Sequence, residues 1–106
     1  MFENQCLIPT VSNDGVAFTA ADFAAFESVL IDHFGGFSLL PGLVAGGWRD
    51  SETGRVYRDD LRVYAVWTEM EGVSDALRAV ADYAKIAFSQ KSISIRMPYL
   101  GRSEIL

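Results

Sequence analysis

The sequence FGGFSLLPGLVAGGWRDSETGRVYRDDLRVYAVW, residues 34–67, determines how the rest of the chain folds. It predicts a helix end at Gly35 and then two strands that fold back on each other, because the polar loop 50–54 separates two apolar runs. The first run, residues 37–48, contains Pro41 and three glycines, so we expect a kinked strand. The second run, residues 61–67, alternates. We expect its core face to consist of Leu61, Val63, Ala65 and Trp67.

Amphipathic segments flank this hairpin on both sides. Before it, residues 5–11 predict a short strand, and the capping box from Thr19 to Asp22 opens a helix. After it, Ser74 is the expected N-cap of a second helix, and residues 92–97 alternate as a half-exposed strand. The apolar stripes of the two helices are Phe23, Phe26, Leu30 and Phe34, and Leu77, Val80, Ala81, Ala84 and Phe88. Residues 98–106 have no clear period and form an arm or one more short strand.

The expected order of elements is strand, helix, strand, strand, helix, strand. This βαββαβ order is typical of a ferredoxin-like α+β fold, in which a four-stranded antiparallel sheet carries both helices on one face. The 106 residues predict one domain, residues 1–106, because a single core usually serves a chain of this length.

Composition limits the environment and the partners of the protein. The only cysteine, Cys6, excludes an intramolecular disulfide and favours a reducing compartment. The N-terminus lacks the features of a signal peptide, and no apolar run reaches the ~20 residues that cross a bilayer. We therefore expect a cytoplasmic protein. The net charge of −5 argues against non-specific nucleic-acid binding, which needs clustered Lys and Arg.

The negative charge is concentrated in the first half of the chain. Residues 1–48 contain five acidic residues and no Lys or Arg, whereas the nine basic residues all lie in residues 49–106, with the other nine acidic ones. A solvated helix face explains this asymmetry, and so does an acidic docking surface formed by Asp22, Glu27 and Asp32. Both interpretations stay open.

Two blocks of sequence carry a resemblance to a known group of proteins. The residues concerned are Phe34, Gly36, Phe37, Gly46 or Gly47, Trp48 and Gly54 in the first block, and Tyr83, Phe88, Gln90 and Ser92 in the second. With its F-x-G-hydrophobic, G-x-W and F-x-Q-x-S motifs, the chain resembles a family of small uncharacterised bacterial proteins. The resemblance spans roughly residues 26–95. It implies a ferredoxin-like fold and supplies no activity.

No arrangement of residues predicts a known reaction. His33 is the only histidine, so a histidine relay or a multi-histidine metal site is excluded. Asp59 and Asp60 are neighbours in a strand and point to opposite faces, so they do not form a carboxylate pair. No serine lies in G-x-S-x-G, and the glycines do not form G-x-G-x-x-G. We predict no catalytic residue, no metal and no cofactor.

The exposed face of the sheet is the remaining candidate surface. We expect it to carry Arg62, Tyr64, Thr68, Ser92, Ser94 and Arg96. Mixtures of aromatic and arginine side chains are typical of contact surfaces, which favours a protein interface and a homodimer. The alternative is a ligand cleft covered by a second subunit and lined by Trp48 and Tyr64, with Arg62 and Arg96.

These observations predict a non-enzymatic acidic protein that binds another protein and does not bind nucleic acid or membranes. Its predicted protein-binding residues are Asp22, Glu27, Asp32, Arg62, Tyr64 and Arg96. The charge alone indicates an inhibitor of a nucleic-acid-handling machine, encoded by a phage or mobile element. The alternative is a small dimeric enzyme or ligand-binding protein whose pocket lies between the sheet face and a second subunit.

Overall fold

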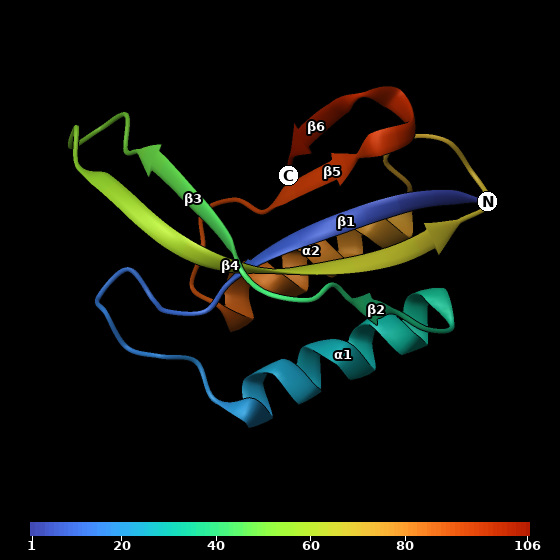
Figure 1. Cartoon of the computed structure of the whole chain (residues 1–106), viewed down its shortest axis with the longest axis horizontal. Coiled ribbons are helices and arrows are strands. Elements are labelled where there is room, and N and C mark those ends of the chain that lie inside the picture. Colours follow the sequence, from blue (N-terminus) through green and yellow to red (C-terminus); the bar gives the residue numbers. More distant parts are fainter.

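A computed structural model describes all 106 residues and shows an α+β fold with two helices and a six-stranded antiparallel sheet (Figure 1). Its elements are β1 (Phe2–Pro9), α1 (Ala20–Phe34), β2 (Ser38–Leu39), β3 (Val44–Arg49), β4 (Val56–Thr68), α2 (Asp75–Ala87), β5 (Ser94–Met97), the 3-10 helix η1 (Pro98–Leu100) and β6 (Arg102–Ile105).

Strands β1 and β4 form the centre of the sheet. The sheet order is β2-β4-β1-β5-β6, and β3 also pairs with β4. β1 and β4 are antiparallel along all of β1, from Phe2 opposite Thr68 to Pro9 opposite Leu61. Beyond that point β4 continues with β3 alone, so the β3–β4 hairpin extends past the other strands (Figure 1).

The prediction of four strands is wrong because two local turns create two further strands. Leu40–Leu43 interrupt the predicted strand 37–48, with Gly42 at φ 76°, and leave β2 and β3 paired to different parts of β4. In the tail, Gly101 at φ 62° reverses the chain, and β6 returns along β5. The predicted kink is therefore confirmed, and of the two alternatives for residues 98–106, an arm or a short strand, the structure shows the strand.

The caps of α1 follow the sequence prediction. The Thr19 side chain accepts a hydrogen bond from the Asp22 backbone, and the Asp22 carboxylate accepts one from the Thr19 backbone at 2.8 Å. Gly35 ends the helix in the left-handed conformation at φ 78°. These local signals are strong because they satisfy backbone groups that the helix leaves unpaired.

Both helices pack on one face of the sheet and enclose the core. Phe26, Leu30, Leu77 and Ala84 are fully buried, and Phe34 packs at the edge of the same cluster. The strands contribute Cys6 and Ile8 from β1, Tyr64 and Val66 from β4, and Ile95 and Met97 from β5, with Ile93 just before β5. Helix stripes predicted from the sequence thus meet as expected.

The predicted orientation of β4 is wrong. Tyr64 and Val66 face the helices, whereas Leu61 and Trp67 lie on the opposite face, where Trp67 is 38% exposed. The pairing of β4 with β1 places Tyr64 opposite Cys6, and both are fully buried in the helix-covered core. Both faces of β4 carry apolar side chains, so alternation alone did not decide which one the helices cover.

Neither helix has the length and apolar character that crossing a membrane requires.

Candidate functional site

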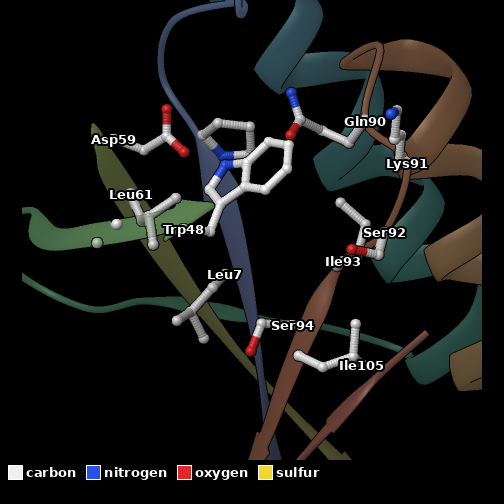
Figure 2. A pocket seen from close by; sticks show the side chains of 13 residues that line it. Leu7, Trp48, Asp59, Leu61, Gln90, Lys91, Ser92, Ile93, Ser94 and Ile105 are labelled. Atoms are coloured by element: carbon white, nitrogen blue, oxygen red, sulfur yellow. The ribbon is translucent and has the colours of Figure 1, made fainter. Parts of the chain in front are cut away.

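A cavity of about 290 Å³ opens on the face of the sheet that the helices leave uncovered (Figure 2). We call this face the open face. Five of the six strands, all except β2, contribute to the cavity, together with the loop that follows α2. Its lining consists of Leu7, Pro9, Gly46, Gly47, Trp48, Asp59, Leu61, Gln90, Lys91, Ser92, Ile93, Ser94 and Ile105.

The strand pairing explains why these residues converge. Gly46 is opposite Asp59 and Trp48 is opposite Tyr57, so these side chains share one face of the hairpin. Leu7 pairs with Val63 on one side and Ser94 on the other, which continues the same face across β1 and β5. A Cβ on Gly46 would lie 2.9 Å from Leu61 Cδ1, so the glycine allows the Leu61 side chain to approach β3 closely.

Trp48 is the largest side chain of the cavity. Its indole stacks on the Tyr57 ring, with centroids 4.7 Å apart and an interplanar angle of 18°. The Arg55 guanidinium lies over the Tyr57 ring, 4.7 Å from its centroid. Figure 2 shows the indole between Asp59 and Gln90. Stacking restricts the indole and leaves a half-buried aromatic surface in the cavity.

Asp59 and Lys91 are the two charged residues of the lining, and they come from different walls. Lys91 Nζ donates a hydrogen bond to Asp50 Oδ2 at 3.1 Å, which joins the loop after α2 to the turn of the β3–β4 hairpin. Asp50 Oδ1 accepts the backbone N–H groups of Glu52 and Thr53. The Glu52 backbone hydrogen bond, then that from Lys91, lowers the pKa of Asp50, and the bond to Asp50 raises the pKa of Lys91.

Tyr64 and Trp48 do not share a cleft, although both were predicted to line one. Tyr64 lies under α1 on the helix-covered face, and its hydroxyl donates to Glu27 Oε2 at 2.7 Å. Arg62 lies on the same side, with its guanidinium 3.8 Å from the Phe23 ring centroid and its Nη1 donating to the Tyr64 hydroxyl. The predicted exposed face is therefore wrong for Arg62, Tyr64 and the buried Thr68.

The predicted acidic docking residues have different surroundings. Asp22 caps α1, the Glu27 carboxylate is engaged by Tyr64, and Asp32 is exposed. Arg96 is exposed on the open face, opposite Gln5. A role of any of these side chains in binding a protein stays a prediction.

Three cavity residues were missed from the sequence as site residues. The sequence was searched for a carboxylate pair of Asp59 with Asp60 and not for Asp59 alone, although alternation places Asp59 on the same side as Leu61. Gln90 belongs to the F-x-Q-x-S motif, which was the available signal. Nothing in the sequence indicated Lys91, because its position depends on how the α2 loop meets the hairpin.

A second, more open cavity of about 370 Å³ lies at the other end of β4. It includes the second tryptophan, Trp67, together with His33, Phe34 and the exposed Met70. The two tryptophans therefore belong to two separate cavities, which provides an internal control for ligand binding.

Comparison with solved structures identifies the fold with that of a known enzyme. The chain is similar to a phage SAM lyase in complex with S-methyl-5′-thioadenosine, with a TM-score of 0.69 over 99% of this chain and 88% of that chain, at 13% identity. It is also similar to a phage SAM lyase in the apo state, with a TM-score of 0.59 over 99% and 87% of the two chains, at 15% identity. No family model and no curated protein matches the chain.

These similarities contradict the prediction of a non-enzymatic protein that acts by binding another protein. The proteins that share the fold over almost the whole chain are lyases, one of them holding a small nucleoside ligand. Charge was the basis of the earlier prediction, and charge reports on solubility and association rather than on fold or chemistry. The more specific prediction, an inhibitor of a nucleic-acid-handling machine, depended on the same argument from charge and is withdrawn together with the prediction of a non-enzymatic protein.

Proposed function

We propose that this protein binds S-adenosylmethionine (SAM) in the open-face cavity and cleaves it to S-methyl-5′-thioadenosine (MTA). The observation that carries the proposal is the fold likeness to a SAM lyase holding MTA, which extends over 99% of this chain. The cavity supports it independently, because its volume of about 290 Å³ is close to the lower end of the range for small-molecule sites.

The lining has groups that suit a nucleoside. Adenine stacks well on aromatic rings, and Trp48 offers a rigid aromatic surface fixed by Tyr57. A carboxylate is the usual partner of ribose hydroxyls in nucleotide sites, and Asp59 lies beside Trp48. Leu7, Leu61 and Ile105 complete the site with apolar surface.

The same residues suit the positive charge of the sulfonium. Aromatic rings attract cations through their negative faces, and Asp59 adds a full negative charge to the same wall. MTA has a neutral sulfur and loses these attractions. We therefore propose that Trp48 binds both molecules, whereas the charge of Asp59 favours the sulfonium of SAM.

The reaction is balanced without a protein nucleophile. The bond between the sulfonium sulfur and the γ-carbon of the amino-acid group breaks, and its electron pair stays on sulfur, which gives neutral MTA. An oxygen of the substrate's own carboxylate forms the new bond to that carbon and closes a lactone. Positive and negative charges disappear together, so a site less polar than water favours the step. The protein contributes by holding the substrate bent, which is a positioning effect.

Mass spectrometry of the products tests this function. Purified protein incubated with SAM should produce MTA faster than SAM decays in buffer alone. Trp48→Ala should lower kcat/KM about tenfold, because a base stacked on an aromatic ring contributes about 1–3 kcal/mol. Trp67→Ala is the matched control and should retain the wild-type rate, since Trp67 lies in the other cavity.

A folded wild-type protein that produces no MTA above the buffer rate would contradict the proposal. An equal loss in the Trp48→Ala and Trp67→Ala proteins would contradict the location of the site.

A further inference from the structure

We propose that Gln90 and Lys91 recognise the amino-acid group of SAM and thereby distinguish the substrate from the product. This inference rests on the proposed function. SAM carries a carboxylate and an α-ammonium group, whereas MTA has neither. A residue pair that binds this group would hold the substrate and release the nucleoside product.

Lys91 is suited to the carboxylate because it is held in place and still has donors to offer. It is the only cation in the cavity lining. Its ammonium group has three donors, and Asp50 Oδ2 accepts one of them at 3.1 Å. The side chain is 67% exposed, so the other two donors remain accessible from solvent. Asp50 acts as a positioning residue, since its carboxylate is itself fixed by two backbone N–H groups.

Gln90 is suited to the α-ammonium group. Its amide nitrogen donates to the Phe88 carbonyl at 2.9 Å, which fixes the side chain and leaves the amide oxygen as an acceptor. Figure 2 shows this side chain reaching the Trp48 indole on the side away from Asp59. The amino-acid group would then lie near the part of the indole beside Gln90, and the ribose near the part beside Asp59.

The backbone before these two residues supports a functional role. Ser89 has φ 51° and is the only residue other than glycine with a positive φ. Helices that end in this conformation usually place glycine there, and a serine is strained. Strained conformations cluster at ligand sites, and here the strained turn directs the next two side chains to the cavity.

Isothermal titration calorimetry with two stable ligands tests the inference. S-adenosylhomocysteine keeps the amino-acid group and has a neutral sulfur that does not leave readily, and MTA lacks the amino-acid group. Wild-type protein should bind S-adenosylhomocysteine about tenfold more tightly than MTA, because hydrogen bonds to charged groups are the stronger ones. Lys91→Gln should remove most of this difference and leave MTA affinity unchanged.

Two further variants control the experiment. Glutamine at position 91 still offers Asp50 a donor, so the loop keeps its anchor, and Lys91→Arg should restore most of the affinity for S-adenosylhomocysteine. Lys85→Gln makes the same charge change on α2, where Lys85 pairs with Asp82 outside the cavity, and should have no effect. In the turnover assay Lys91→Gln should raise KM without lowering kcat, because the negative charge of the carboxylate that it binds decreases from the bound substrate to the transition state.

Two outcomes would overturn the inference while leaving the proposed function in place. In the first, Lys91→Gln lowers the affinity for S-adenosylhomocysteine and for MTA by the same factor. In the second, Lys91→Gln keeps the wild-type preference for S-adenosylhomocysteine over MTA. Failure of both ligands to bind wild-type protein would overturn the inference and the proposed function together.

Discussion

The hydroxyl of Tyr64 forms a hydrogen bond with the carboxylate of Glu27 in α1. It donates to Glu27 Oε2 at 2.7 Å, while its ring packs edge-on against Phe26 and Phe37. Burial first, and then the bond to Glu27, raises the pKa of Tyr64 to about 12, so the hydroxyl stays a donor throughout the physiological range. A large polar aromatic residue is stable in this core because its one polar group has a charged partner.

Tyr64→Phe tests this contribution at the residue scale. The change keeps the ring and leaves the Glu27 carboxylate without its short hydrogen bond. We expect a loss of about 1–2 kcal/mol in the free energy of unfolding, since bonds to charged groups are worth somewhat more than neutral ones. Tyr83→Phe is the matched control, because the Tyr83 hydroxyl makes no hydrogen bond in the structure. Equal urea midpoints for the two variants would refute this account.

Tyr64 also shows where prediction from the sequence stops at this scale. Its alternation with Arg62 and Val66 was visible, and the three do lie on one face of β4. Which face the helices cover was not visible, because Leu61, Val63 and Ala65 are also apolar. The choice depends on pairing with β1 and on Glu27, which is 37 residues away.

At the scale of elements, the β3–β4 hairpin and the loop after α2 form the two walls of the cavity. Asp50 and Lys91 join these walls. The pKa of Asp50 is below its usual value, so the ionised carboxylate stabilises the folded state. This contribution is present above the unfolded pKa and is lost as the pH falls through the lower folded pKa.

Comparison of wild type with Asp50→Asn across pH tests this connection. At neutral pH the variant should unfold at a lower urea concentration, because asparagine has no charge and cannot form the ion pair that Asp50 makes with Lys91. As the pH falls well below 3.8, the ordinary pKa of an aspartate carboxyl group, the urea midpoints of wild type and variant should converge. Asp50 is then protonated in both the folded and the unfolded state. A difference in midpoint that is the same at neutral and acidic pH would show that Asp50 stabilises the turn without its charge.

Element prediction succeeded where the signal was local. The capping box at Thr19, the glycine end at Gly35 and the kink near Pro41 depend on neighbouring residues, and the structure contains all three. The cavity depends on the meeting of β1, β3, β4 and the α2 loop, which are distant in sequence. Local sequence patterns were therefore sufficient to predict the helices and the long strands. Predicting that Trp48, Asp59 and Lys91 lie together would have required the register in which the strands pair.

At the scale of the whole molecule, the fold places helices on one face of the sheet and leaves the other face with the cavity. The order of the long elements was predictable, whereas the separation of residues 37–48 into β2 and β3 was not, and β6 was one of two alternatives for the tail. The predicted homodimer stays a prediction, and the mass in solution measured by light scattering tests it. Residues 1–48 contribute to the cavity through β1 and β3, but none of their five acidic residues lines it, which explains why charge misdirected the functional prediction.

The most direct test of the central claim is a two-dimensional ¹H–¹⁵N spectrum of the protein titrated with MTA. The two tryptophans give two indole N–H signals, one from each cavity. We expect the Trp48 signal to shift with increasing MTA, together with the backbone signals of residues 92–94, while the Trp67 signal stays in place. A shift of Trp67 alone, or no shift of either indole at millimolar MTA, would contradict a nucleoside site on the open face.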